Sequence, residues 1–170
     1  MRNGNSKTGS ICTKICSVEF LKDLLCCVFG ACAMFVSSII KIPFVYVPFT
    51  LQTLAVVLLS VFFGKKHTIG SLLLFNVVCP PSLIMTIGYR IGFFAVPFIV
   101  HRNIVERGAL VSTIVILLSL FVVSFIGMLW LACFIGIRSA FINGFLFFIP
   151  AEILKTVIAV AVIKFCKIRK

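Results

Sequence analysis

Charged side chains are scarce in this sequence, and acidic ones are the scarcest. Only 12% of the 170 residues are charged, and only 4 residues are acidic, whereas charged residues make up about 25% of a typical soluble domain. Hydrophobic residues reach 62%, and the mean hydropathy is +1.26. A water-soluble domain of this composition would expose large apolar patches. The composition therefore argues against a soluble enzyme, a disordered chain and a nucleic-acid-binding domain.

The motifs of common catalytic and metal sites are also missing. The sequence has no G-x-x-x-x-G-K-[ST] loop for ATP, no G-x-S-x-G nucleophile motif and no H-E-x-x-H zinc motif. The 8 cysteines show no C-x-x-C spacing, and His67 and His101 lie in charged connections, where we expect both to be solvated. We therefore expect no catalytic residues, no metal and no cofactor, and transport driven by ATP would need another subunit.

What the sequence does contain is a series of long apolar runs joined by short basic connections, as in a multi-pass membrane protein. A helical span needs about 20 apolar residues, so a chain of this length holds roughly six spans. We expect an all-α integral membrane protein of the cell membrane, a single membrane domain built as a bundle of six transmembrane helices. The expected spans are residues 24–40, 50–63, 68–79, 82–100, 109–135 and 150–165.

Two connections carry expectations of their own. Residues 42–49 contain two prolines and are predicted to be extended, because proline removes a backbone donor and disfavours helix in the residue before it. Residues 136–149 are predicted to form a loop that touches the membrane interface.

The basic residues fix the expected orientation. With six spans and the N-terminus inside, most of the 16 Lys and Arg residues fall on the cytoplasmic side, and only Lys41 and Arg138 fall outside. Such an excess follows the positive-inside rule. We therefore predict that both termini are cytoplasmic. The cytoplasmic cations are Arg2, Lys7, Lys14, Lys22, Lys65, Lys66, Arg102, Arg107, Lys164, Lys167, Arg169 and Lys170.

Three ionisable residues lie inside the predicted spans, namely Arg90, Glu152 and Lys155. Ionisable groups at bilayer depth are costly and are functional candidates by default. Glu152 and Lys155 are three residues apart and share a helix face, and Pro150 places them near the start of that helix. The formal charges of Glu152, Lys155 and Arg90 sum to +1, so a ligand with one carboxylate would make the site neutral. That carboxylate could pair with the arginine. The alternative is that Glu152 and Lys155 only neutralise each other while Arg90 snorkels to the interface.

Further polar and small residues lie in the apolar runs. Gln52, Asn76 and Tyr89 could line the same cavity, although each alone is more often part of a helix–helix hydrogen bond. The small residues Gly30, Ala33 and Ser37 have spacings that permit close helix approach. They form either a partner-facing stripe or ordinary internal packing.

Four segments, in chain order, resemble the BioY family. The run I-P-F-V-Y-V-P-F-T-L-Q-T-L at residues 42–54 is similar to the family's V-P-F-T-L-Q-T signature. The run I-G-Y-R-I-G-F at residues 87–93 is similar to its G-G-Y-x-x-G-F stretch. The runs G-M-L-W-L-A at residues 127–132 and F-I-P-A-E-I-L-K at residues 148–155 resemble its W-L-A and F-x-P-[GA]-[DE]-x-x-K elements.

The resemblance implies a biotin-binding membrane subunit, the S component of an energy-coupling-factor (ECF) transporter, open to the outside. It implies as partners biotin, a transmembrane coupling subunit and a pair of ATPases. From the composition we also expect contact with membrane lipid and none with nucleic acid. The resemblance also implies that Glu152 and Lys155 contact the ligand, together with Arg90, Tyr89 and Asn76.

The chemistry of biotin suits these residues. We hypothesise that Glu152 and Asn76 accept hydrogen bonds from the ureido N–H groups, Lys155 donates to the ureido oxygen and Arg90 pairs with the carboxylate. The apolar bicycle would rest on Tyr89 and Trp130. The expected ligand-binding residues are Gln52, Asn76, Tyr89, Arg90, Trp130, Glu152 and Lys155. The alternatives are an S component for another small vitamin, a ligand-free structural or assembly membrane protein, and an intramembrane enzyme, for which no nucleophile–base pair or metal triad is apparent.

Overall fold

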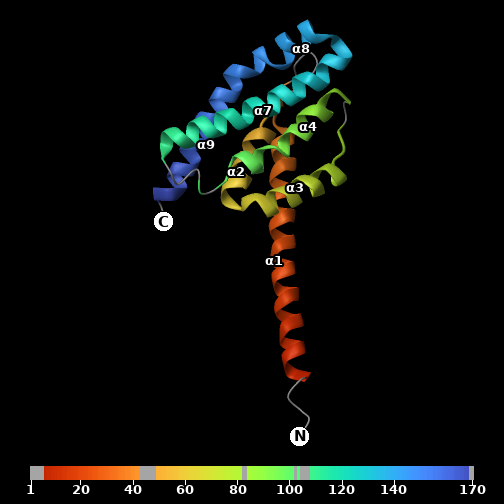
Figure 1. Ribbon diagram of the computed structural model, residues 1–170, viewed down its shortest axis with the longest axis vertical. Coiled ribbons are helices and arrows are strands. Elements are labelled where there is room, and N and C mark those ends of the chain that lie inside the picture. The colour runs from red at the N-terminus through yellow and green to blue at the C-terminus, as the bar shows by residue number, and fades with distance from the viewer. Residues whose placement is uncertain (1–5, 43–48, 82–83, 102, 104–107, 169–170) are drawn as a thin grey trace.

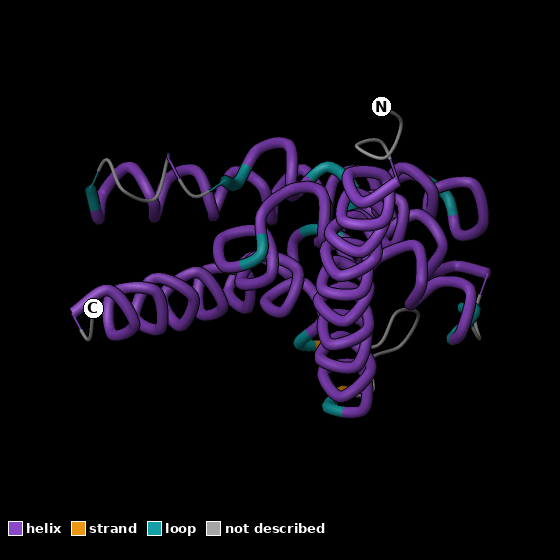
Figure 2. Tube along the Cα trace, turned by 90° about the horizontal axis from the view of Figure 1, so that it is seen from below, coloured by secondary structure: helices purple, strands orange, loops and turns teal. Residues whose placement is uncertain are grey.

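The computed structural model describes residues 6–42, 49–81, 84–101, 103 and 108–168. These residues are almost wholly helical (Figure 2), which confirms the predicted all-α architecture. The N-terminal half of α1 extends away from the other helices (Figure 1). The helices are α1 (Ser6–Ile39), α2 (Gln52–Phe62), α3 (Gly64–Val78), α4 (Ile87–Phe93), α5 (Val96–Ile99), α7 (Ala109–Ile135), α8 (Ile137–Gly144) and α9 (Ile149–Ile168), with the 3-10 turns η1 (Ile84–Thr86) and η2 (Leu146–Phe148).

Three helical stretches are long and apolar enough to cross a membrane, namely Glu19–Ile39, Ala109–Ile135 and Ile137–Cys166. Their outward faces carry large apolar side chains such as Leu110, which is 81% exposed. Exposed apolar area on this scale is expected of a surface that contacts lipid. A membrane protein is therefore confirmed, while the division into six spans and the location of the termini stay predictions.

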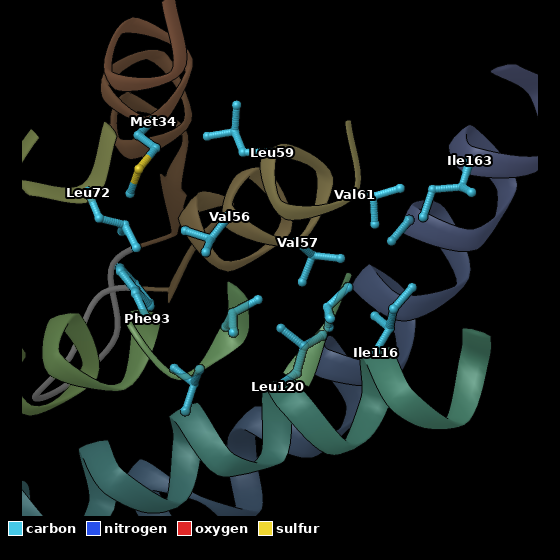
Figure 3. Packing of buried hydrophobic residues seen from close by; sticks show 14 of the residues in the cluster. Met34, Val56, Val57, Leu59, Val61, Leu72, Phe93, Ile116, Leu120 and Ile163 are labelled. Atoms are coloured by element: carbon cyan, nitrogen blue, oxygen red, sulfur yellow. The ribbon is translucent and has the colours of Figure 1, made fainter. Parts of the chain in front are cut away.

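The short helix α2 lies at the centre of the bundle and is enclosed by its neighbours (Figure 3). It has 11 residues and spans about 16 Å, roughly half of the hydrocarbon core. A helix buried in this way is apolar on most faces, and α2 supplies four fully or nearly buried residues to the core. Its first turn carries Gln52 and Thr53 into the interior. The core residues labelled in Figure 3 are Met34, Val56, Val57, Leu59, Val61, Leu72, Phe93, Ile116, Leu120 and Ile163.

The chain departs from the sequence-based boundaries in three places. Helix α1 begins at Ser6 and not at residue 24, because hydropathy indicates which part of a helix is apolar and not where the helix starts. The prediction of a loop at residues 136–149 is wrong, because this segment forms α8 and η2. The predicted continuous span at 82–100 is interrupted, with Pro97 in the first turn of α5.

A short pair of strands flanks the proline-containing segment. β1 (Lys41–Ile42) pairs antiparallel with β2 (Phe49–Thr50), with Lys41 opposite Thr50. Residues 43–48, where the prediction of extended backbone falls, lie outside the described residues. The strand pair leads the chain from the end of α1 into the start of α2.

Small residues allow α1 and α3 to pack closely. A Cβ atom on Gly30 would lie 2.2 Å from the Ser71 hydroxyl oxygen, and one on Gly70 would lie 2.6 Å from the Cys27 sulfur. Gly30 therefore serves internal helix packing, which is one of the two alternatives for its stripe. Ala33 and Ser37 are half-buried, and the Ser37 hydroxyl donates to the Ala33 carbonyl at 2.8 Å. That these two residues face a partner stays a prediction.

An ion-pair cluster also joins α1 to α3, and it corrects the expectation that His67 is solvated. The His67 Nε2 and Asp23 Oδ1 atoms are 2.9 Å apart, and Lys66 Nζ lies 2.6 Å from Asp23 Oδ2. The contact was missed because Asp23 lies more than forty positions away in the sequence. The hydrogen bond to Asp23, followed by that to the Phe63 carbonyl, raises the pKa of His67 above its ordinary value. His101, by contrast, is exposed.

The raised pKa of His67 predicts that stability depends on pH. The charged His67–Asp23 contact stabilises the fold fully below the unfolded-state pKa of about 6.5, and this contribution is lost as pH rises through the higher folded-state pKa. Because Asp23 is 40% exposed and solvent screens the contact, we expect the loss to be small. Unfolding of the detergent-purified protein, measured from pH 6 upwards, checks this, and His67→Gln should remove the dependence. An equal pH dependence in the variant would contradict the assignment.

Candidate functional site

A cavity of about 250 Å³ lies among α2, α4, α7 and α9. Its volume is just below the roughly 300–1,000 Å³ typical of sites for drug-sized ligands, so it suits a small molecule. Five of the predicted ligand-binding residues line it, and Asn76 and Trp130 do not. The lining residues are Ser38, Thr50, Gln52, Thr53, Cys79, Pro80, Thr86, Tyr89, Arg90, Phe93, Val123, Ser124, Phe148, Glu152 and Lys155.

The centre of the cavity wall is a buried ion pair at the start of α9. Glu152 and Lys155 are only 2% and 3% exposed. The Lys155 Nζ atom donates to Glu152 Oε1 at 3.1 Å and to the Thr53 hydroxyl of α2 at 2.8 Å. Glu152 lies in the first turn of α9, where the helix dipole favours a carboxylate. Sequence spacing predicts the pair, whereas the contribution of Thr53 was missed.

Two polar atoms in this wall are buried and have no hydrogen-bond partner among the residues that the structure describes. They are the Oε2 atom of Glu152, an acceptor when ionised, and the Nε2 atom of Gln52, a donor. Both residues line the cavity, and Gln52 is 6% exposed. Leaving such atoms unsatisfied costs about 1–3 kcal/mol each. A ligand that offers a donor to one and an acceptor to the other would recover this cost.

Arg90 lines the cavity from the last turn of α4 and is held against the end of α3. Its Nη1 atom donates to the Asn76 side-chain oxygen at 3.3 Å and to the Cys79 carbonyl. Its guanidinium lies 5.0 Å from the centre of the Phe75 ring, a distance typical of a cation–π contact. Asn76 therefore positions Arg90 and has no place in the cavity wall itself. The other guanidinium nitrogens give Arg90 further donors for a ligand.

Tyr89 forms an aromatic part of the wall and connects α4 to α8. Its ring stacks on Phe148 at 5.6 Å, and its hydroxyl donates to the Gly144 carbonyl at 2.8 Å. The ring also rests on Gly127, where a Cβ atom would lie 2.2 Å from it. Tyr89 thus fixes the position of the α8–η2 segment beside the cavity.

Removal of the Tyr89 hydroxyl should therefore loosen this segment. Tyr89→Phe is expected to lower the free energy of unfolding by about 1–3 kcal/mol, because the buried Gly144 carbonyl loses its donor. Thermal unfolding of purified protein measures the change, with Trp130→Phe as a second variant that removes a more exposed hydrogen bond. Identical stability of Tyr89→Phe and wild type would show that the hydroxyl does not hold α8.

Trp130 is not among the residues that line the cavity. Its indole nitrogen donates to the Ile84 carbonyl at 2.9 Å, and its side chain covers Gly88, where a Cβ atom would lie 2.2 Å away. The aromatic walls of the cavity are instead Tyr89, Phe93 and Phe148. Phe93 and Phe148 lie in the two family-like segments at 87–93 and 148–155, which is the signal that could have identified them.

The ionisable residues of the cavity carry a formal charge of +1, from Arg90, Lys155 and Glu152. No group of three His, Cys, Asp or Glu residues in the described part of the chain lies close enough to hold a metal ion. The cavity thus offers a cation, an ion pair, two unsatisfied polar atoms and aromatic walls to a small anionic ligand.

Three comparisons with known proteins all point to the same family. A model of the BioY family matches residues 6–80 and 81–170. A probable biotin transporter BioY from Pyrococcus horikoshii is 30% identical over 126 residues, which cover 68% of this chain and 78% of that protein. A second, from Rickettsia prowazekii, is 26% identical over 155 residues, which cover 82% and 80%.

A solved structure shares the fold. The crystal structure of the S-component for biotin from an ECF-type ABC transporter superposes with a TM-score of 0.72 and 22% identity, covering 88% of this chain and 92% of that chain. The family model matches nearly the whole sequence, and the matched residues include those that line the cavity and the motifs around it. The chain therefore belongs to the BioY family.

Proposed function

We propose that this protein binds biotin in the cavity and is the membrane-embedded substrate-binding subunit of an ECF-type transporter. The observation that carries the proposal is the pair of buried unsatisfied atoms, Gln52 Nε2 and Glu152 Oε2, in a cavity of charge +1. The names of the two relatives and of the solved structure support biotin as the ligand. A ligand-free structural protein would have no use for two unsatisfied polar atoms beside a cavity.

The ureido ring of biotin matches this pair of atoms. It has N–H donors on both sides of one strong carbonyl acceptor. An N–H group would donate to Glu152 Oε2, and the carbonyl would accept from Gln52 Nε2 and from Lys155. Compared with the hypothesis from sequence, Asn76 no longer accepts from an N–H group, because its side-chain oxygen already accepts from Arg90, and Gln52 is added as a donor to the carbonyl.

The rest of the molecule has partners as well. The carboxylate of the tail would pair with Arg90, whose planar donors suit a bidentate contact. The complex would then be neutral, which matters because an uncompensated charge is costly in a membrane interior. The apolar bicycle would pack on Tyr89, Phe93 and Phe148, which takes over the role first assigned to Trp130.

Transport would require partners. The sequence has no ATP-binding P-loop, so we infer that a transmembrane coupling subunit and ABC-type ATPases supply the energy. We also infer six spans with both termini cytoplasmic, because twelve of the 16 cations then fall inside. The Glu152 end of α9 would consequently open toward the outside.

A binding panel tests the proposal. Detergent-purified protein is incubated with labelled biotin, thiamin, riboflavin and folate at equal concentrations, and retained label is measured. We expect saturable retention of biotin alone, competed by unlabelled biotin. Retention of another vitamin in place of biotin would favour the alternative of a different S component.

A further inference from the structure

Thr53 connects the start of α2 to the buried ion pair of α9. Its side chain is 7% exposed and lines the cavity. The hydroxyl oxygen accepts a hydrogen bond from Lys155 Nζ at 2.8 Å, across 102 positions of sequence. Thr53 is therefore part of the ion-pair network, although it carries no charge.

The Glu152 carboxylate alone does not fix the position of the Lys155 ammonium. Lysine has a flexible four-carbon side chain that ends in a compact point charge with rotatable donors. Both oxygens of an ionised carboxylate accept hydrogen bonds. Without the Thr53 hydroxyl, the ammonium could approach either oxygen of Glu152 or lie between them. The hydroxyl supplies a second fixed point, on a different helix.

The two oxygens of Glu152 have different surroundings as a result. Lys155 Nζ is 3.1 Å from Oε1. The Oε2 atom is buried and has no hydrogen-bond partner within the described ranges of the chain. The carboxylate thus has one oxygen that is occupied by the lysine and one that is left for a ligand.

We infer that Thr53 is a positioning residue for biotin binding, which holds Lys155 at one oxygen of Glu152 and so keeps the other available to a ureido N–H group. The inference rests on the proposed function. In this role Thr53 needs no contact with the ligand. In its absence the ammonium would also reach Oε2 and compete with the ligand for that acceptor.

Thr156 offers a matched control on the same ion pair. It is a threonine of α9, 2% exposed, and its hydroxyl donates to the main-chain carbonyl of Glu152 at 2.8 Å. It is not among the residues that line the cavity. Thr156→Val and Thr53→Val each remove one buried hydroxyl near Glu152, but only Thr53→Val removes a contact of the Lys155 ammonium.

Isothermal titration calorimetry of biotin into detergent-purified full-length variants tests the inference, and circular dichroism verifies that each variant is folded. We expect Thr53→Val to weaken biotin binding by about 5- to 20-fold, the effect of one hydrogen bond. Thr53→Ser keeps the hydroxyl, so it should bind within about twofold of wild type, as should Thr156→Val. The preference for biotin over biotin amide should be unchanged in Thr53→Val, because Arg90 sets it.

Wild-type affinity in folded Thr53→Val, or an equal loss in Thr156→Val or in Thr53→Ser, would overturn the inference. A reduced preference for biotin over its amide would overturn it as well, because the substitution would then have disturbed the whole cavity. If Thr53→Val does not fold, Thr53→Ala takes its place, with an expected loss of at least about threefold. Failure of folded wild type to bind biotin would instead contradict the proposed function, and this inference with it.

Discussion

Replacing Glu152 by Gln should reduce the affinity for biotin by about 2–5 kcal/mol, roughly 30- to 5,000-fold in Kd. Glu152 Oε2 is buried and has no hydrogen-bond partner in the described part of the chain, so it is placed to accept from a ligand N–H group. The amide of Gln weakens that acceptor and removes the negative charge from a cavity that keeps two cations. Isothermal titration calorimetry with detergent-purified protein measures the loss.

The same substitution also affects stability, and the two effects must be separated. Glu152→Gln leaves the buried Lys155 ammonium without its carboxylate, and breaking a buried pair costs about 3–5 kcal/mol. The double variant Glu152→Gln/Lys155→Gln removes both charges, so its stability should recover toward that of wild type while biotin binding stays lost. A stable double variant that binds biotin as wild type does would show that the pair has a structural role only.

The second large effect is expected at Arg90. Arg90→Gln should weaken biotin binding by about 10- to 150-fold, because a charge-assisted hydrogen bond to the carboxylate contributes about 1.5–3 kcal/mol. Biotin amide, which lacks the carboxylate, should change by less than about threefold. Titration of each ligand into wild type and variant gives the comparison.

Arg90 also contacts Asn76, Cys79 and Phe75, so its loss could disturb the end of α3. Arg90→Lys is the control, because it keeps the charge and loses the planar donor geometry. It should retain part of the selectivity for biotin over its amide. An equal loss of affinity for both ligands in Arg90→Gln would show that Arg90 only supports α3.

Local spacing explains why part of the site could be predicted from the sequence. Glu152 and Lys155 are three residues apart and follow Pro150, so a helix start and a shared face were expected from these residues alone. The structure places the two side chains 3.1 Å apart. The burial of Gln52 depends on α2 being enclosed by other helices, which no local pattern reports. Its place in the cavity was predicted only because it is a polar residue at the start of an apolar run.

Other features depend on packing between distant segments. Helix α7 is apolar on most of its surface, so its sequence gives no sign that Trp130 bonds to Ile84 and does not line the cavity. The polar atoms of Asn76 were equally suited to a ligand or to a neighbour, and the end of α3 places them beside Arg90. The pairing of His67 with Asp23 likewise depends on how α1 meets α3.

The central claim is that a cavity built around a buried ion pair holds one molecule of biotin. Isothermal titration calorimetry of biotin into the detergent-purified wild-type chain and into the Glu152→Gln/Lys155→Gln variant tests it most directly. We predict saturable binding of one biotin per wild-type chain and none to the folded double variant. Absence of binding to folded wild type, or indistinguishable binding to both proteins, would contradict the claim.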